Sequence, residues 1–154
     1  MAVALITGTG APRGIGMACA RALGRAGFDL AITATSGRIE ARRAELMAEG
    51  FNVLAFQGDL TDPASVARLF DATGPAEVLV NNAGIHRRAP FETMSLSDWQ
   101  TVMDTNLTSA FIVSQAVSRY MRSSAAKERS SISLRLMRKR PGRPLPIIAP
   151  LRAA

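Results

Sequence analysis

The stretch Thr7-Gly8-Thr9-Gly10-Ala11-Pro12-Arg13-Gly14-Ile15-Gly16 decides the fold because of what stands on either side of it. An apolar run over residues 3–6 precedes it, and an alanine-rich helical pattern over residues 17–25 follows it. Glycine has no Cβ, so such a turn lets main-chain N–H groups and the N-terminus of the next helix approach an anion closely. The combination predicts a dinucleotide site at this turn.

The spacing of the glycines can be interpreted in two ways. Counting from Gly8 leaves two extra residues in the loop, whereas counting from Gly10 gives a Gly-x-x-x-Gly-x-Gly pattern through Gly14 and Gly16. Both spacings put the last glycines at the start of the helix, where the helix dipole favours an anion.

Length and composition indicate one domain in a chain of 154 residues. The sequence has no apolar run of membrane-spanning length and no signal-peptide pattern, so we expect a cytoplasmic protein with no membrane partner. His86 has no clustered histidine or cysteine beside it, and we expect no metal site.

The net charge of +7 is unevenly distributed. Residues 1–121 carry ten arginines and eleven acidic residues, whereas residues 122–154 carry nine basic residues and one acidic residue. The basic character therefore belongs to the tail, and nucleic acid is not expected as a partner of the remainder.

Strand-like runs alternate with helical patterns up to residue 121. We expect strands over residues 3–6, 29–33, 52–57 and 77–81, and helices over residues 14–26, 39–49, 62–70 and, capped by Ser97 and Asp98, on to about Met121. This alternation predicts an α/β fold with a Rossmann-like, doubly wound parallel sheet.

The alternation stops after Met121, and the proline-rich run from Lys139 onward fits neither a helix nor a central strand. We therefore expect a fold truncated after the fourth strand–helix unit. It would comprise a nucleotide-binding half-domain over residues 1–121 and a poorly ordered, irregular basic tail over residues 122–154.

Three further segments accompany the glycine turn: Asp59-Leu60 after the third strand, Asn81-Asn82-Ala83-Gly84 after the fourth, and Asn106 in the following helix. In order and spacing, the four segments resemble the short-chain dehydrogenase/reductase family over about residues 3–121. Residues 81–91 and 105–111 most resemble its gluconate 5-dehydrogenase and 3-oxoacyl-carrier-protein reductase branches.

The resemblance implies a role for each matching residue. Gly10, Gly14, Ile15 and Gly16 would approach the pyrophosphate, and Asp59, followed by Leu60, would hydrogen-bond the adenine. Asn81, Ala83 and Gly84 would line the cofactor cleft and brace the first strand. Asn106 would be the asparagine of the family's Asn-Ser-Tyr-Lys tetrad, where it holds a water in the proton relay.

The end of the second strand favours NADP over NAD. An acidic residue normally stands there to bind the ribose 2′-hydroxyl of NAD, but this chain has Ala34. Nearby Arg13 and Arg38 could hold a 2′-phosphate, with Thr35 and Ser36 as hydroxyl partners. The alternative is that Arg38 is only a solvated residue at a helix start.

The family's chemistry also needs a serine and a Tyr-x-x-x-Lys pair, which this chain lacks. Its one tyrosine, Tyr120, is followed four places later by Ser124, and we expect it to pack rather than react. By resemblance the intact parent protein is an NAD(P)-dependent oxidoreductase of a small-molecule carbonyl or alcohol, in a family that is usually homo-oligomeric. This chain is expected to be inactive.

The tail suggests a shifted reading frame. If each new codon takes the last base of one codon and the first two of the next, residues 129–136 can spell Val-Ile-Asn-Ile-Ser-Ser-Leu, a normal fifth strand for the family. A tyrosine codon can then span Ile147 and Ile148, and a lysine codon can span Leu151 and Arg152. The alternative is a nucleotide-binding remnant with a genuine basic extension that binds polyanions nonspecifically.

Overall fold

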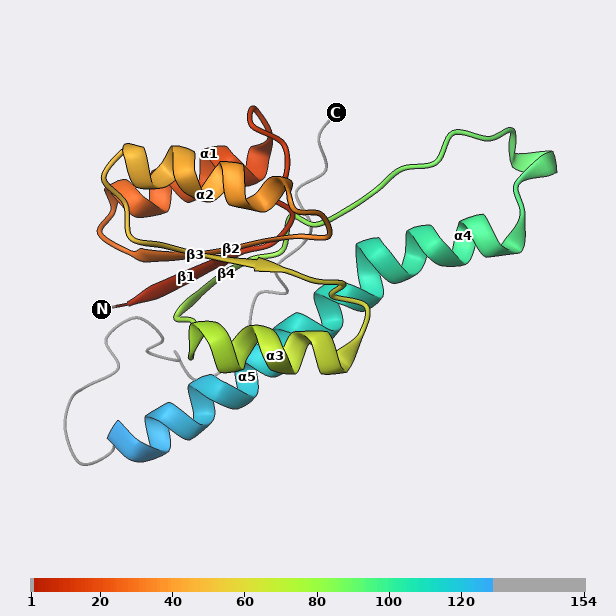
Figure 1. Cartoon of the computed structure of the whole chain (residues 1–154). Coiled ribbons are helices and arrows are strands. Elements are labelled where there is room, and N and C mark those ends of the chain that lie inside the picture. The colour runs from red at the N-terminus through yellow and green to blue at the C-terminus, as the bar shows by residue number, and fades with distance from the viewer. Residues whose placement is uncertain (1, 129–154) are drawn as a thin grey trace, which may run out of the picture.

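The computed structural model describes residues 2–128, and the account below refers to them. They form one parallel sheet covered by helices on both faces (Figure 1). The elements are β1 (Val3–Ile6), α1 (Ile15–Arg25), β2 (Asp29–Ala34), α2 (Arg38–Ala48), β3 (Val53–Gln57), α3 (Pro63–Thr73), β4 (Val78–Val80), a 3-10 turn (Phe91–Thr93), α4 (Leu96–Met103), a π-helical turn (Asp104–Thr108) and α5 (Ser109–Glu128).

The strands lie in the order β3-β2-β1-β4, and every pair is parallel. Ala4 of β1 pairs with Leu30 of β2 on one side and with Val78 of β4 on the other. The chain therefore moves outward from β1 in one direction and then crosses to its other side. This is the doubly wound, Rossmann-like topology that the sequence predicted.

Alternate side chains of each strand enter opposite halves of the core. Ala4 and Ile6 face the layer of α1 and α2 with Met17 and Leu46, whereas Leu5 faces the layer of α3 and α5. All five side chains are fully buried. Because helices cover both faces of the sheet, its strands are continuously apolar rather than alternating.

The predicted start of the long helix was wrong. The N-cap is Ser95, whose Oγ accepts the main-chain N–H of Asp98 at 3.0 Å and donates to the Asp98 carboxylate at 2.8 Å. Both bonds join the Ser95 hydroxyl to Asp98, the third residue of the helix, which places the cap before Ser97. The helix is also interrupted, since the N–H of Ser109 bonds to the carbonyl of Asp104, one residue further back than in an α-helix.

Helix α5 continues to Glu128, beyond the change in composition at Met121. The rest of the basic tail, residues 129–154, lies outside the described residues, as does the sequence proposed to hide a fifth strand. In Figure 1, α4 and the loop before it extend away from the sheet. Phe91 and Leu96 in this region are exposed, as is Phe111 near the start of α5. Within the described part, no helix is both long and apolar enough to cross a membrane.

Candidate cofactor site

A cavity of about 280 Å³ lies where the carboxyl ends of the strands meet. Its walls come from four strand-end loops and the long helix. They are the glycine turn (Gly8, Gly10 and Ala11), the loop after β2 (residues 34–36 and Arg38), the loop after β3 (residues 58–61), the loop after β4 (residues 83–85), and Thr105 and Ser109. In a doubly wound sheet, the point where the strand order reverses is where such a cleft forms and where ligands bind.

The two candidate spacings of the glycine turn start at Gly8 and at Gly10, and these two residues have different roles in the structure. Gly8 has a φ of 70°, and a Cβ placed on it would lie 2.6 Å from the Cα of Ala83. Gly10 lines the cavity, and a Cβ there would have one neighbour within 4 Å among the described residues, the Ala34 Cβ at 3.4 Å. Gly8 is therefore required by the approach of two loops, whereas Gly10 keeps space open in the cavity.

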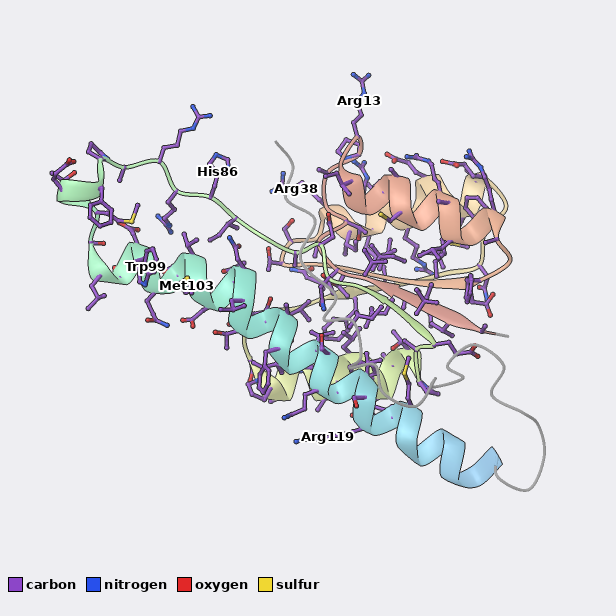
Figure 2. All side chains as sticks on the ribbon, turned by 180° about the vertical axis from the view of Figure 1, so that it is seen from behind. Arg13, Arg38, His86, Trp99, Met103 and Arg119 are labelled. Carbon is purple, nitrogen blue, oxygen red and sulfur yellow. The ribbon has the colours of Figure 1, made fainter. Side chains whose placement is uncertain are left out.

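The other predicted residues of the turn lie at the start of α1. Gly14 is the N-cap of α1 and has no side-chain cap, so the first N–H groups of the helix have no side-chain acceptor. Gly16 is buried, and a Cβ there would lie 2.7 Å from the Asn82 Nδ2 atom. Gly14, Ile15 and Gly16 are not in the cavity wall. Arg13 is exposed, also lies outside the wall, and projects outward from the turn in Figure 2.

The glycine turn is joined to the loop after β4 by Thr7 and Asn82, neither of which was predicted as a site residue. The Thr7 hydroxyl accepts the main-chain N–H groups of Asn82 at 3.0 Å and Ala83 at 2.9 Å. The Asn82 Nδ2 group donates to the carbonyls of Thr7 and Gly8, both at 2.9 Å. The sequence shows a threonine at the end of β1 and an asparagine at the end of β4. Their hydrogen bonds could be predicted only if β1 and β4 were known to be neighbours in the sheet.

The loop after β2 places Ser36 and Arg38 together in the cavity wall. The Arg38 Nε group donates to the Ser36 Oγ atom at 3.3 Å, and the Arg38 side chain is exposed. Ala34 ends β2 and also lines the cavity, so this corner holds a cation and a hydroxyl without a carboxylate at the strand end. Of the two predicted arginines, the structure brings Arg38 to the cavity and leaves Arg13 away from it.

The loop after β3 presents Asp59 and Thr61 to the cavity around the anchored Leu60. Leu60 is 6% exposed and packs in the core below α3. The Asp59 Oδ1 atom accepts the Thr61 main-chain N–H at 2.9 Å and the Thr61 hydroxyl at 2.8 Å. Thr61 was not among the predicted residues, although an aspartate after a strand commonly accepts the main-chain N–H two residues on.

Asn106 in the π-helical turn holds the loop after β4. Its Oδ1 atom accepts the N–H of Ile85 at 2.7 Å, and its Nδ2 group donates to the carbonyl of the same residue at 2.8 Å. A Cβ on Gly84, which lines the cavity with Ala83, would lie 3.2 Å from the Asn106 Oδ1 atom. Asn81 points elsewhere, since its Nδ2 group donates to Ser114 of α5 at 2.9 Å and it does not line the cavity.

Two other groups considered in the sequence lie outside the cavity wall. Tyr120 stacks on Phe70 of α3 with ring centroids 4.9 Å apart, a packing role like the one expected. His86, Arg87 and Arg88 are exposed on the extended loop, where Figure 2 shows His86, and Arg87 forms an ion pair with Asp98 at 3.1 Å. Within residues 2–128, no three histidine, cysteine, aspartate or glutamate side chains gather where they could hold a metal ion.

Comparisons with known proteins agree with this arrangement. The family model described as short chain dehydrogenase matches residues 2–132. Gluconate 5-dehydrogenase of Gluconobacter oxydans is 38% identical over 118 residues, which are 73% of this chain and 46% of that protein. The 3-oxoacyl-(acyl-carrier-protein) reductase of Synechocystis sp. is 40% identical over 125 residues, or 77% of this chain and 50% of that protein.

A crystal structure of a metagenomic short-chain oxidoreductase in complex with NADP is similar with a TM-score of 0.71 at 32% identity. The similarity covers 80% of this chain and 57% of that one. The chain spans about half the length of the curated relatives it matches.

Proposed function

Since the chain belongs to the short-chain dehydrogenase family, we propose that its cavity binds NADP(H) in preference to NAD(H), and that the chain as written does not turn over a substrate. The observation that carries the proposal is the meeting of four strand-end loops at one cavity, with Gly10, Arg38 and Asp59 in its wall. For the complete protein we propose a small-molecule carbonyl or secondary alcohol as substrate.

The residues present suit a dinucleotide. Gly10 leaves its main chain accessible from the cavity, and the N-terminus of α1 begins at Gly14 without a side-chain cap. A pyrophosphate lying between Gly10 and the N-terminus of α1 would meet free main-chain N–H groups and the positive end of the helix dipole. A nicotinamide cofactor, when bound, donates a hydride to a carbonyl or accepts one from an alcohol.

The corner beyond β2 supports the preference for NADP. Arg38 and Ser36 offer a guanidinium and a hydroxyl within one loop, their nearest atoms 3.3 Å apart. Such groups suit a 2′-phosphate, whereas a 2′-hydroxyl calls for a carboxylate at the position of Ala34. We assign this role to Arg38 rather than to Arg13, because Arg13 is not among the residues that line the cavity.

The inactivity of the chain follows from what the resemblance requires. The family's acid–base tyrosine is followed by a lysine four places later. This chain has no counterpart of that pair, because the residue four places after Tyr120 is Ser124. Asn106 alone of the four tetrad residues has a match, and its amide bonds to the main chain of Ile85. General acid–base catalysis typically contributes about 10²–10⁴-fold to a rate, so its loss leaves at most a trace of activity.

We attribute the missing residues to a shift of reading frame in residues 122–154. Sequencing the coding DNA tests this directly. A one-base or two-base slip between about codons 119 and 128 must open a frame that encodes the family's serine, tyrosine and lysine. If no such slip does so, the explanation fails.

A second function is favoured by the tail, which carries nine basic residues and one acidic residue. As a genuine extension it would bind polyanions nonspecifically. DNA binding by the full chain should then weaken steeply as salt rises. Absence of DNA binding at physiological salt would exclude this function without affecting nucleotide binding in the cavity.

The proposal is tested by calorimetric titration of the purified chain with NADPH and NADH, alongside a carbonyl-reduction assay with NADPH. We expect saturable binding of NADPH, weaker binding of NADH, and no turnover above a trace. Absence of nucleotide binding would overturn the binding function, and clear turnover would overturn the proposed inactivity.

A further inference from the structure

We propose that Thr61 is a positioning residue that orients the Asp59 carboxylate and thereby makes the cavity selective for adenine over hypoxanthine. The inference rests on the proposed binding of NADP(H), with the adenine beside Asp59 as the family resemblance implies. Both residues lie in the cavity wall, two positions apart in the loop after β3.

The two carboxylate oxygens of Asp59 are in different situations. Oδ1 accepts two hydrogen bonds from Thr61, one from its main-chain N–H at 2.9 Å and one from its hydroxyl at 2.8 Å. Oδ2 has no hydrogen bond or ion pair with any of the described residues. Thr61 therefore occupies one oxygen and leaves the other available to a ligand.

The chemistry of a carboxylate limits what that second oxygen can recognise. An ionised carboxylate only accepts hydrogen bonds. Adenine joined to ribose presents one donor group, the exocyclic N6 amine, while its ring nitrogens are acceptors. Hypoxanthine has a carbonyl oxygen in place of this amine, and that oxygen would face the carboxylate with like polarity. Oδ2 can thus distinguish the two bases only if the carboxylate is held toward the amine.

The surroundings explain why Thr61 is needed for this. Asp59 is exposed, so packing does not fix its side chain. Leu60 is anchored in the core and holds the main chain of the loop, and the β-branched Thr61 has a restricted χ1 angle. The Thr61 hydroxyl has one proton, which it donates to Asp59. Rotation of the carboxylate would lose both bonds from Thr61.

The test compares binding of NADPH with that of its hypoxanthine analogue, reduced nicotinamide hypoxanthine dinucleotide phosphate, to the full chain. We expect the wild type to bind NADPH about tenfold more tightly, the effect of one charge-assisted hydrogen bond. Thr61→Val removes the hydroxyl and keeps the shape of the side chain, and it should reduce the ratio to about threefold or less. Thr61→Ser keeps the hydroxyl and should retain the wild-type ratio.

A double-mutant cycle separates positioning from a merely structural role. In an Asp59→Ala background, Thr61→Val should have no further effect on the ratio, because Thr61 acts through Asp59. If Thr61→Val does not fold, as judged by circular dichroism, Thr61→Ala takes its place in the cycle.

An unchanged ratio in folded Thr61→Val or Thr61→Ala, or an equal effect of the substitution with and without Asp59, would overturn the inference. A wild-type chain that binds both nucleotides equally well would overturn it and leave the cofactor site standing. A wild type that binds neither would overturn the proposed function as well.

Discussion

The Thr7 hydroxyl accepts the main-chain N–H of Asn82 at 3.0 Å, and the Asn82 side chain donates to the Thr7 carbonyl at 2.9 Å. This reciprocal pair joins the ends of β1 and β4, which are neighbours in the sheet but 75 residues apart in sequence. It fixes two loops of the cavity relative to each other, and Thr7 is 2% exposed.

Thr7→Val should therefore destabilise the fold. The substitution keeps the shape of the side chain but leaves the N–H groups of Asn82 and Ala83 without their acceptor, at a cost of about 2–4 kcal/mol. Urea unfolding followed by circular dichroism measures the change. As a control, Thr35→Val alters an exposed threonine whose hydroxyl has no hydrogen bond among the described residues, and it should stay within about 0.5 kcal/mol of wild type. Equal effects of the two substitutions would contradict the role given to Thr7.

Two contributions to the cost of a side chain at Gly8 can be measured separately: the close approach of the Ala83 main chain and the positive φ angle. Gly8 and Gly27 both have positive φ angles, 70° and 91°, but a Cβ on Gly27 would have nothing within 4 Å among the described residues. Gly27→Ala should cost about 1–2 kcal/mol for the left-handed conformation alone. Gly8→Ala should cost about 2 kcal/mol more, since the Ala83 main chain must move. Thermal or urea unfolding of both variants checks this, and a cost at Gly8 no larger than that at Gly27 would refute the close approach.

Arg38 and Arg13 should differ in their effect on cofactor binding. Arg38→Ala is expected to weaken NADPH binding about tenfold, the effect of one charge-assisted contact, and to leave NADH binding unchanged. Arg13→Ala removes the same charge from a side chain that lies outside the cavity wall and should change neither affinity by more than about twofold. Calorimetric titration of the two variants gives the comparison. The assignment of Arg38 fails if Arg13→Ala is the variant that loses affinity for NADPH.

The bonds between Asn106 and Ile85 should be visible in hydrogen exchange. Asn106→Ala removes the acceptor of the Ile85 N–H, which lies 2.7 Å from the Asn106 Oδ1 atom. Exchange at the Ile85 amide should accelerate about tenfold, corresponding to one lost hydrogen bond. Asn81→Ala removes a neighbouring amide that bonds to Ser114 and should leave Ile85 unaffected. An Ile85 amide that exchanges at the wild-type rate in Asn106→Ala would show that the Asn106 side chain does not hold this loop.

The sequence predicted those parts of the fold that depend on local pattern. The first strand was predicted over the residues where β1 is found, and the alternation of strand-like runs with helical patterns predicted the doubly wound parallel sheet. The start of α4 was misplaced because Ser95 and Ser97 are both plausible caps, and only the bond to the Asp98 N–H selects Ser95. The π-helical turn was not predicted, since the sequence indicated one continuous helix there.

The site was predictable where a motif carried it and less so where it depends on tertiary contacts. Asp59 and Gly10 were expected at the cofactor and do line the cavity. Thr7 and Asn82 were missed because their bonds join segments distant in sequence. Arg13 and Arg38 were both predicted as partners of a 2′-phosphate, and of the two only Arg38 lines the cavity.

The central claim is that the cavity is an NADP(H) site whose preference is set at the end of β2. The most direct test is the ratio of the dissociation constants for NADH and NADPH, measured by calorimetry for the wild-type chain and for Ala34→Asp. We predict that the wild type binds NADPH at least about tenfold more tightly, and that Ala34→Asp reverses the preference by repelling the 2′-phosphate and accepting a bond from the 2′-hydroxyl. A wild type that prefers NADH, or a ratio that Ala34→Asp leaves unchanged, would contradict this account.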